Sequence, residues 1–463
     1  MTHRFAFALT LLAAAPALAQ PAQPVPPDDM AAFEKDLDAL FTAGGLTADQ
    51  AAARAGKVSP TVLRKVAELE ASTAEATATE LQLVPQLNGK LSYTRLSFIP
   101  PFTIAIPGVP PIPIQFFQNS YDAQANLVVP ISDYVVRFPR LLDAAHLAED
   151  AARANKLSAE VDAGEDARLA YYEWVRARLQ VLIAQRQLGQ VQATLVQEQS
   201  LFDVQRVSKA DLMRIQSQEA EAEQTLDQLT NLSELREEQL RLLIGAREDE
   251  PLAIGEDIRK DLAAPAVAGL DDLVQRAEHR RLDFRVLDIG IEAKEKQRAA
   301  EESSYYPKLS AYGTVEDARP NQRYFPQTDQ FKFTWDAGVE LTWTLNDALT
   351  TMTTRDRLAA ETDELRADRE NLVRGTRIEV LSAIQAVRIA VHALSTSQKG
   401  LAAAEESYRV RRELLLAERA TAVELVDAQT DLTRARITAL NARIDLRVAL
   451  AQLTHAIGDD ASR

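Results

Sequence analysis

The chain has 463 residues, which allows one large domain or two to three ordinary ones. Its 46% hydrophobic and 26% charged residues are typical of a folded protein, and a net charge of −16 without a long basic run argues against nucleic-acid binding. The absence of cysteine excludes disulfides, thiolate metal sites and a lipid-anchored N-terminal cysteine. No apolar run after residue 20 is expected to reach the roughly 18 residues that a membrane helix needs.

A targeting segment is predicted at the N-terminus. Arg4 precedes an apolar core over 5–15, which is too short to span a bilayer, and Ala17 and Ala19 fit a small-x-small cleavage pattern. We therefore expect a signal peptide over 1–19 and then a tether with a short helix over 20–44.

The next residues alternate between helix and strand signals. A helix is expected over 47–84, with Thr47 as its cap and Pro60 as a break or kink. Alternating apolar and polar residues predict two strands, 86–95 and 121–129. Between them, the proline-dense stretch 98–118 is predicted to be a long irregular loop on the extracellular side, because it cannot pair as a central strand. Whether this loop is an ordered surface loop or covers a pore mouth stays open.

Long helices follow. Residues 133–206 contain little glycine or proline and are rich in alanine, leucine, glutamine and charged residues, which predicts a very long helix or coiled coil of roughly 110 Å. Ser208 with Asp211 forms a capping-box pattern that starts another helix, and Gly245 ends it. Residues 246–268 are predicted to be a linker or equatorial segment.

The same order of signals returns after the linker. The expected elements are a helix, two strands and two more helices, over 271–306, 309–315, 331–345, 347–419 and 421–457. In 331–345 every odd residue is apolar and the even ones are polar, charged or glycine, for longer than a soluble strand usually runs. This pattern favours a membrane strand of a barrel. The alternative that stays open is an edge strand of a soluble sandwich.

An internal duplication with a period of about 200 residues is predicted. Three anchors recur in the same order: Pro85-Gln86-Leu87 with Pro307-Lys308-Leu309, Asp133 with Asp347, and Ile244-Gly245 with Ile457-Gly458. The expected domains are a first repeat over 45–245 with hairpin 86–129, a second repeat over 269–458 with hairpin 307–345, and a tail over 459–463. The fold class is therefore mainly α with a small β part, built on long antiparallel helical hairpins.

Four strands are too few for a membrane barrel, since the smallest have about 8, and open strand edges are not tolerated in lipid. If the strands are inserted, the chain must oligomerise. More than half of the aromatic residues lie in 91–134 and 305–343, as in the interfacial girdles of a barrel, although an aromatic core of a small β-domain is the alternative. The predicted lipid-facing residues are Phe333, Trp335, Val339, Leu341 and Trp343.

Residues 45–458 resemble the outer-membrane efflux protein family, the TolC-like proteins. The most telling pieces are Glu406-Ser407-Tyr408 and Ala422-Val423-Glu424-Leu425-Val426-Asp427-Ala428-Gln429, followed by a last-helix pattern that ends at Gly458. Arg281-Leu282-Asp283 stands near the family's Arg-Pro-Asp, with Leu282 in place of the proline. The chain also departs from the family in having no glycine in the turns near 205–207 and 418–420.

The resemblance implies a homotrimer with a twelve-stranded barrel in the outer membrane and a coiled-coil tunnel in the periplasm. It also implies a periplasmic adaptor protein and an inner-membrane pump or transporter as partners, with outer-membrane lipid around the barrel. The function would be passive conduction of exported solutes in tripartite efflux or type I secretion. The sequence does not separate drugs, metals and proteins as substrates.

The end of the tunnel far from the membrane is predicted to be an acidic gate. Asp211 and Glu424 lie three residues after the caps Ser208 and Thr421, where an acid also favours the helix end without any pore role. Asp427 shares a helix face with Glu424. In the resembling family, the positions that match Glu424 and Asp427 line the periplasmic entrance, and threefold symmetry would repeat them as rings.

No catalytic, cofactor or metal site is expected. The five histidines are scattered, no His-x-x-x-His or nucleophile motif occurs, and the protein is not expected to be an enzyme. The main competing hypothesis is a secreted or periplasmic coiled-coil scaffold without channel activity. A third is the periplasmic adaptor itself, although adaptors have one helical hairpin between β-rich domains.

Overall fold

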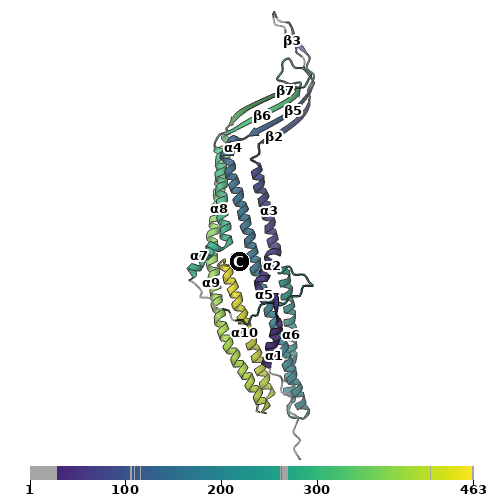
Figure 1. The fold of residues 1–463 in the computed structure, drawn as a ribbon, viewed down its shortest axis with the longest axis vertical. Helices are drawn as coiled ribbons and strands as arrows, with labels where there is room; N and C mark the ends of the chain where they lie inside the picture. The colour runs from purple at the N-terminus through teal and green to yellow at the C-terminus, as the bar shows by residue number, and fades with distance from the viewer. Residues whose placement is uncertain are drawn as a thin grey trace, which may run out of the picture.

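The computed structural model describes residues 29–460 except 105, 106, 109, 115, 261, 263–268 and 418. The predicted signal peptide and the start of the tether lie outside the described residues. The described chain is very elongated: columns of helix run along most of its length and a β-sheet stands at one end (Figure 1). A mainly helical fold with a small antiparallel sheet is thus confirmed.

The first repeat is built on one helix that spans the columns. This helix, α5 (Arg137–Asp203), has 67 residues and a length of about 100 Å at 1.5 Å per residue. Two shorter helices, α3 (Pro60–Leu81) and α6 (Lys209–Ile244), lie along its upper and lower halves (Figure 1). This repeat also contains α2 (Ala48–Val58), which Thr47 caps with Gln50 in a capping box, and the five-residue α4 (Ile131–Val135).

The second repeat has the same plan. Helix α9 (Leu345–Leu416) has 72 residues, with α8 (Leu282–Glu301) and α10 (Ala422–Ala456) as the half-length helices. The expected single helix over 271–306 is wrong at Arg281, where extended backbone (ψ 134°) separates α7 (Leu270–Arg280) from α8. A short 3₁₀ segment, η1 (Glu302–Tyr305), ends this part.

The break at Arg281 has a counterpart at Ser59, between α2 and α3. Beside each break lies a glycine with positive φ that ends a lower helix, Gly245 (φ 62°) and Gly458 (φ 71°). A Cβ on Gly245 would lie 2.9 Å from Val58 Cγ2, and one on Gly458 would lie 3.0 Å from the Arg281 nitrogen. The same close joint between an upper and a lower helix therefore occurs once in each repeat.

The sheet has four antiparallel strands in the order β2-β5-β6-β7. Their bounds are β2 (Gln86–Arg95), β5 (Asn119–Val129), β6 (Lys308–Arg319) and β7 (Lys332–Thr342). Strand β6 runs four residues beyond the expected end at Val315, because both of its neighbours continue the ladder to Ala318. This is a case in which pairing extends a strand past its own apolar pattern.

The register separates apolar from polar residues across all four strands. One rung consists of Gly89, Ala125, Val315 and Trp335, and the next rung, on the opposite face, consists of Lys90, Gln124, Glu316 and Thr334. Because alternate side chains of a strand point to opposite faces, the sheet has one largely apolar face and one polar face. The alternation of apolar and polar residues predicted within single strands is therefore in register across the sheet.

The proline-dense stretch is not irregular throughout, so that part of the loop prediction is wrong. Strand β3 (Phe102–Ile104) pairs with β4 (Ile112–Ile114), and Thr103 lies opposite Pro113. A two-stranded ladder has solvent on both outer edges, so a proline there does not remove a needed hydrogen bond. This small hairpin extends beyond the four-stranded sheet (Figure 1).

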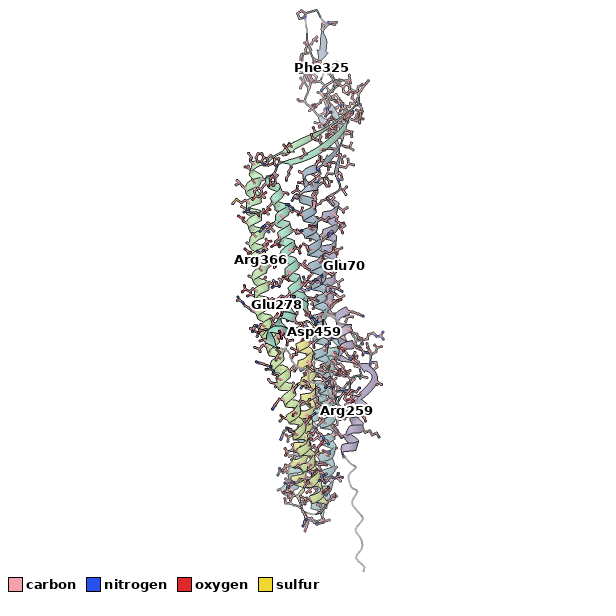
Figure 2. The ribbon with its side chains drawn as sticks, turned by 60° about the vertical axis from the view of Figure 1, so that its left-hand side comes forward. Glu70, Arg259, Glu278, Phe325, Arg366 and Asp459 are labelled. Atoms are coloured by element: carbon pink, nitrogen blue, oxygen red, sulfur yellow. The ribbon has the colours of Figure 1, made fainter. Side chains whose placement is uncertain are left out.

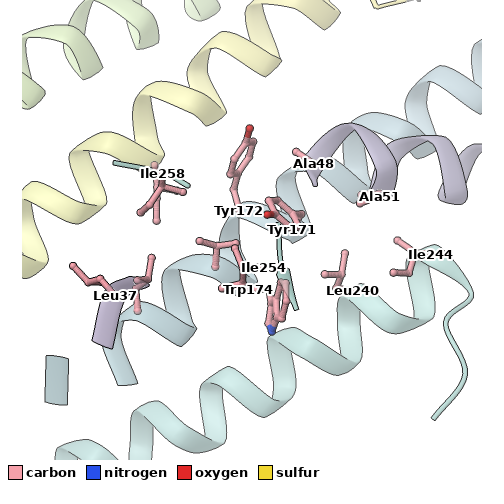
Figure 3. Close-up of a cluster of buried hydrophobic side chains, with 14 of the residues drawn as sticks. Leu37, Ala48, Ala51, Tyr171, Tyr172, Trp174, Leu240, Ile244, Ile254 and Ile258 are labelled. Atoms are coloured by element: carbon pink, nitrogen blue, oxygen red, sulfur yellow. The ribbon is translucent and has the colours of Figure 1, made fainter. Parts of the chain in front are cut away.

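The largest buried cluster lies at mid-height, where α1 (Asp29–Leu40), β1 (Phe41–Leu46) and the segment after Gly245 pack against the long helices. Tyr171 and Trp174 of α5 are at its centre (Figure 3). Arg447, whose side chain is only 4% exposed, donates from Nε to Glu256 Oε1 at 3.1 Å and fixes that segment to α10. Residues 246–260 of the predicted linker or equatorial segment are therefore a packed part of the fold.

The expectation that no segment after residue 20 is apolar enough for a membrane helix is wrong for helix α9, by length and composition alone. It contains an 18-residue window with a mean hydropathy of 1.4 and at most two charged residues, although only 28% of the window is buried in one chain. Val380, Ile384 and Val387 on this helix belong to a core cluster with α7 and α10. The window is therefore in part a core helix face, while Ile378 and Ile389 stay exposed.

Candidate functional site

The apolar face of the sheet is strongly exposed in the single chain. Val339, Trp335 and Leu341 of β7 are 73%, 69% and 67% exposed. Phe333 is exposed on the same face, and Trp343 is exposed just after the strand ends. The five residues predicted to face lipid thus lie on one side, and their contact with lipid stays a prediction.

The sheet has dimensions that suit a bilayer. The 11 residues of β7 extend about 37 Å, which at a tilt of about 45° gives a height of about 26 Å, close to the apolar band of membrane barrels. In the described part of the chain, β2 and β7 each have one unpaired edge. These edges need partners if the sheet is in lipid.

An aromatic and charged belt marks the end of the sheet that lies away from the helices. Tyr121 lies 5.1 Å from Tyr93 and 6.3 Å from Phe331, measured between ring centroids. The Arg319 guanidinium is about 6 Å from the Tyr121 and Phe331 rings and donates to both Asp329 oxygens at 2.9 and 3.1 Å. Such a combination is typical of a membrane–water interface.

The two predicted helix caps lie at the opposite end of the molecule. Thr421 and Glu424 form a full capping box, with Thr421 Oγ1 accepting from the Glu424 nitrogen at 3.3 Å. Ser208 Oγ accepts from the Asp211 nitrogen at 3.2 Å, but it donates to Asp211 Oδ2 at 2.7 Å, so the reciprocal half of that box is absent. Both restarts follow helices that run the length of the columns.

The structure brings arginines to two of the three predicted entrance residues. Arg214 Nη2 of α6 donates to Asp427 Oδ1 of α10 at 3.1 Å, which connects the tips of the two repeats. Arg411 Nη1 of α9 lies 3.0 Å from Glu424 Oε2. These side chains are about half exposed, so each pair contributes only about 0.5 kcal/mol in water.

Sequence reasoning missed both arginines, yet the duplication contains a signal for them. Ser208, Asp211 and Arg214 stand 213 positions before Thr421, Glu424 and Asp427, as Gly245 does before Gly458. Arg214 and Asp427 therefore occupy the same position in the two repeats and meet each other. Because one side chain is positively charged and the other negatively charged, the contact is attractive.

The equivalent of Arg411 in the first repeat is Glu198, again 213 positions earlier. Its side chain is buried at 3% exposure near the tip. Burial, and after it the Asp211 carboxylate, raise the pKa of Glu198. The tip of the second repeat therefore has the Arg411–Glu424 salt bridge, whereas the tip of the first repeat has two acids, Glu198 and Asp211, at the equivalent positions.

A second charged cluster lies at mid-height. His455 donates from one ring nitrogen toward Asp460 Oδ2 at 2.8 Å and from the other toward Glu165 Oε2 at 3.0 Å. Burial alone would lower the pKa of His455, but the hydrogen bonds to Asp460 and Glu165 outweigh it and raise the pKa to about 10. The charged imidazolium joins the end of α10 to α5 and so connects the two repeats.

Groups of three or more His, Asp or Glu side chains that could hold a metal ion are absent from the described residues. The residues near His455 include Arg281 as well as acids, which does not suit a cation.

Comparisons with known proteins agree with this geometry. A family described as outer membrane efflux protein matches residues 273–459. No curated protein matches the chain. The fold is similar to that of CusC, described in terms of transmembrane channel formation, with a TM-score of 0.72, 15% identity and coverage of 90% of this chain and 93% of that chain.

Two further solved structures have the same fold. The open state of the Neisseria gonorrhoeae MtrE outer membrane channel has a TM-score of 0.71 at 17% identity, covering 89% of this chain and 88% of that chain. The outer membrane protein VceC from Vibrio cholerae has a TM-score of 0.70 at 15% identity, covering 89% and 96%. The family model thus matches part of the second half of the chain, and the fold along most of the chain is similar to that of these solved outer membrane proteins.

Proposed function

We propose that three copies of this chain form the exit duct of a tripartite efflux or type I secretion system. The observation that carries the proposal is the open four-stranded sheet, apolar on one face and polar on the other, at the end of helical columns about 100 Å long. Three such sheets, with β2 of one copy beside β7 of the next, would form a twelve-stranded antiparallel barrel without open edges.

The polar face of the sheet would then line the channel. It carries Lys90, Glu316 and Asp336, and Asp336 accepts from Arg323 Nη2 at 2.6 Å. Charged side chains are tolerated there because the lumen of a large barrel contains water. Solutes would pass by diffusion, and the energy for export would come from an inner-membrane pump or transporter, joined through a periplasmic adaptor at the helical end.

The helical tip would be the periplasmic entrance. Asp427 with Arg214, and Glu424 with Arg411, would be repeated three times around the axis. Because Asp427 and Glu424 each have an arginine beside them, we expect weak ion pairs, rather than unpaired acids, to close the resting entrance. Asp211 is the predicted entrance residue without such an arginine among the described contacts.

The test is extraction of the protein from outer membranes followed by light scattering and planar-bilayer recording. We expect a detergent-dependent trimer that conducts ions, and restored export when the gene is returned to a strain that lacks it. A protein that is soluble without detergent and never conducts would instead establish the coiled-coil scaffold.

A further inference from the structure

The two loops at the outer end of the sheet differ sharply in charge. The loop between β6 and β7 carries Arg323 and Asp329, and Phe325 is exposed on it (Figure 2). The connection between β2 and β5 contains the β3–β4 hairpin and has no charged residue between Arg95 and Asp122. The charged β6–β7 loop is compatible with exposure to water, whereas the uncharged, apolar β2–β5 connection is expected to be buried against another surface.

The apolar side chains of this connection are exposed in the single chain. Phe98, Ile99, Phe102, Ile104 and Phe116 range from 38% to 71% exposed. Phe102 and Phe116 contact each other at 6.0 Å between ring centroids, and Phe102 and Ile104 lie on the same face of β3. A two-stranded hairpin is marginal in water by itself, so this surface requires a partner.

Lipid is a poor partner for this surface. The belt of Tyr93, Tyr121, Arg319 and Phe331 lies between the apolar band of the sheet and the hairpin. At the base of the hairpin, Arg95 donates to Asn119 Oδ1 at 2.9 Å and to Gln118 Oε1 at 3.2 Å. A charged and aromatic belt marks the bilayer surface, so the hairpin stands beyond the hydrocarbon.

Another copy of the chain is the partner that the topology supplies. The hairpin continues from β2, the edge strand, and the backbone bond from Leu96 N to Gln118 O at 2.7 Å extends the ladder toward it. In the trimer proposed above, on which this inference rests, the unpaired edge of β2 lies against a neighbour. The hairpins therefore stand at the three subunit boundaries around the channel mouth.

We propose that the three β3–β4 hairpins pack together over the channel mouth through Phe102, Ile104 and Phe116, forming an uncharged apolar constriction at the extracellular end. Such a ring restricts water and ions by dewetting and opens when a solute of sufficient size separates the hairpins. The channel then has two constrictions of opposite chemistry: paired charges at the periplasmic tip and apolar side chains at the exit.

The absence of native cysteine permits a direct test. Phe102→Cys and Ile104→Cys are oxidised in the purified trimer, with Asp329→Cys in the charged loop as the matched control. We expect covalent dimers of the chain within the trimer for the two hairpin variants and none for the control. In intact cells, a membrane-impermeant maleimide should label Asp329→Cys faster than Phe102→Cys.

Conductance provides the second readout. Phe102→Ser should raise single-channel conductance several-fold, whereas Asp329→Ser should leave it unchanged. Trimers that form no dimer on oxidation and label equally at both loops overturn the constriction while the exit-duct proposal stands. Quenching of a probe on Phe102→Cys by lipid-phase quenchers would place the hairpin in the outer leaflet and also overturn it. A protein that is monomeric before oxidation overturns both proposals.

Discussion

At the scale of single residues, the tip pair makes a prediction about ion selectivity. Asp427→Ala leaves Arg214 without the carboxylate that it contacts at 3.1 Å, so three positive charges replace three neutral pairs at the proposed entrance. We expect weaker cation preference or weaker divalent block in single-channel recordings, with the trimer intact because the half-exposed pair contributes little stability. Asp431→Ala, which removes an exposed partner of Arg434 on the same helix, is the control. Unchanged selectivity in Asp427→Ala would remove this residue from the entrance.

The acid pair of the first tip makes a prediction about pH. Because burial and Asp211 raise the pKa of Glu198, its ionised form costs stability at neutral pH, and that stability returns as pH falls through the folded-state pKa. Glu198→Gln should therefore stabilise the first tip at neutral pH and flatten its pH dependence. Hydrogen exchange at the end of α5 measures this, with the exposed Glu221→Gln as the control. Faster exchange in Glu198→Gln at neutral pH would contradict the argument.

The mid-height histidine predicts an effect at alkaline pH. The folded-state pKa of His455 is about 10, against about 6.5 in an unfolded chain, so its contribution is fully present below pH 6.5 and is lost as pH rises through 10. Asp460, Glu165 and Asp162 face the ring, and Arg281 and Asp283 line the same small cavity. His455→Gln should lower the thermal stability at pH 7 and lose the alkaline decline, unlike the exposed His392→Gln. Parallel melting curves for His455→Gln and wild type across pH 7–11 would contradict this.

At the scale of elements, strand β7 predicts different tolerance on its two faces. Val339→Arg places a charge on the apolar face near mid-height, where facing lipid costs roughly 2–4 kcal/mol, whereas Thr342→Arg lies on the polar face. We expect Val339→Arg to reduce the amount of heat-resistant trimer in membranes far more than Thr342→Arg. Equal amounts of trimer would mean that this face does not contact lipid.

Local patterns were sufficient to predict most elements. The alternation over 86–95 and 331–345 predicted β2 and β7 to within a few residues, and Ser208, Thr421 and the two glycines predicted the helix ends, because these signals act over one turn or one strand. The break at Arg281 could not be predicted, since Leu282 replaces the proline that would mark it, and close packing against Gly458 accompanies it. Arg214 and Arg411 were missed because their contacts join distant segments.

At the scale of the whole molecule, the exposed stripe of α9 predicts a subunit interface. Ile378 and Ile389 are 70% and 69% exposed and stand three helical turns apart on one face. In the trimer proposed above, Ile389→Asp would bury an unpaired carboxylate between copies, so we expect light scattering to show a monomer for this variant. Lys399→Asp, an exposed change on the same helix, should leave the trimer intact. A stable trimer of Ile389→Asp would place this stripe outside the interface.

The contact between Arg214 and Asp427 also limits how the two halves of the chain can be exchanged. Since these residues hold the same position in the two repeats, a chain made of two first halves would bring arginine against arginine, and one made of two second halves would bring aspartate against aspartate. Like charges at that distance repel where the present pair attracts. The two halves of the chain are therefore not interchangeable at the tip, because the attraction between their helical hairpins at this position depends on the difference between Arg214 and Asp427.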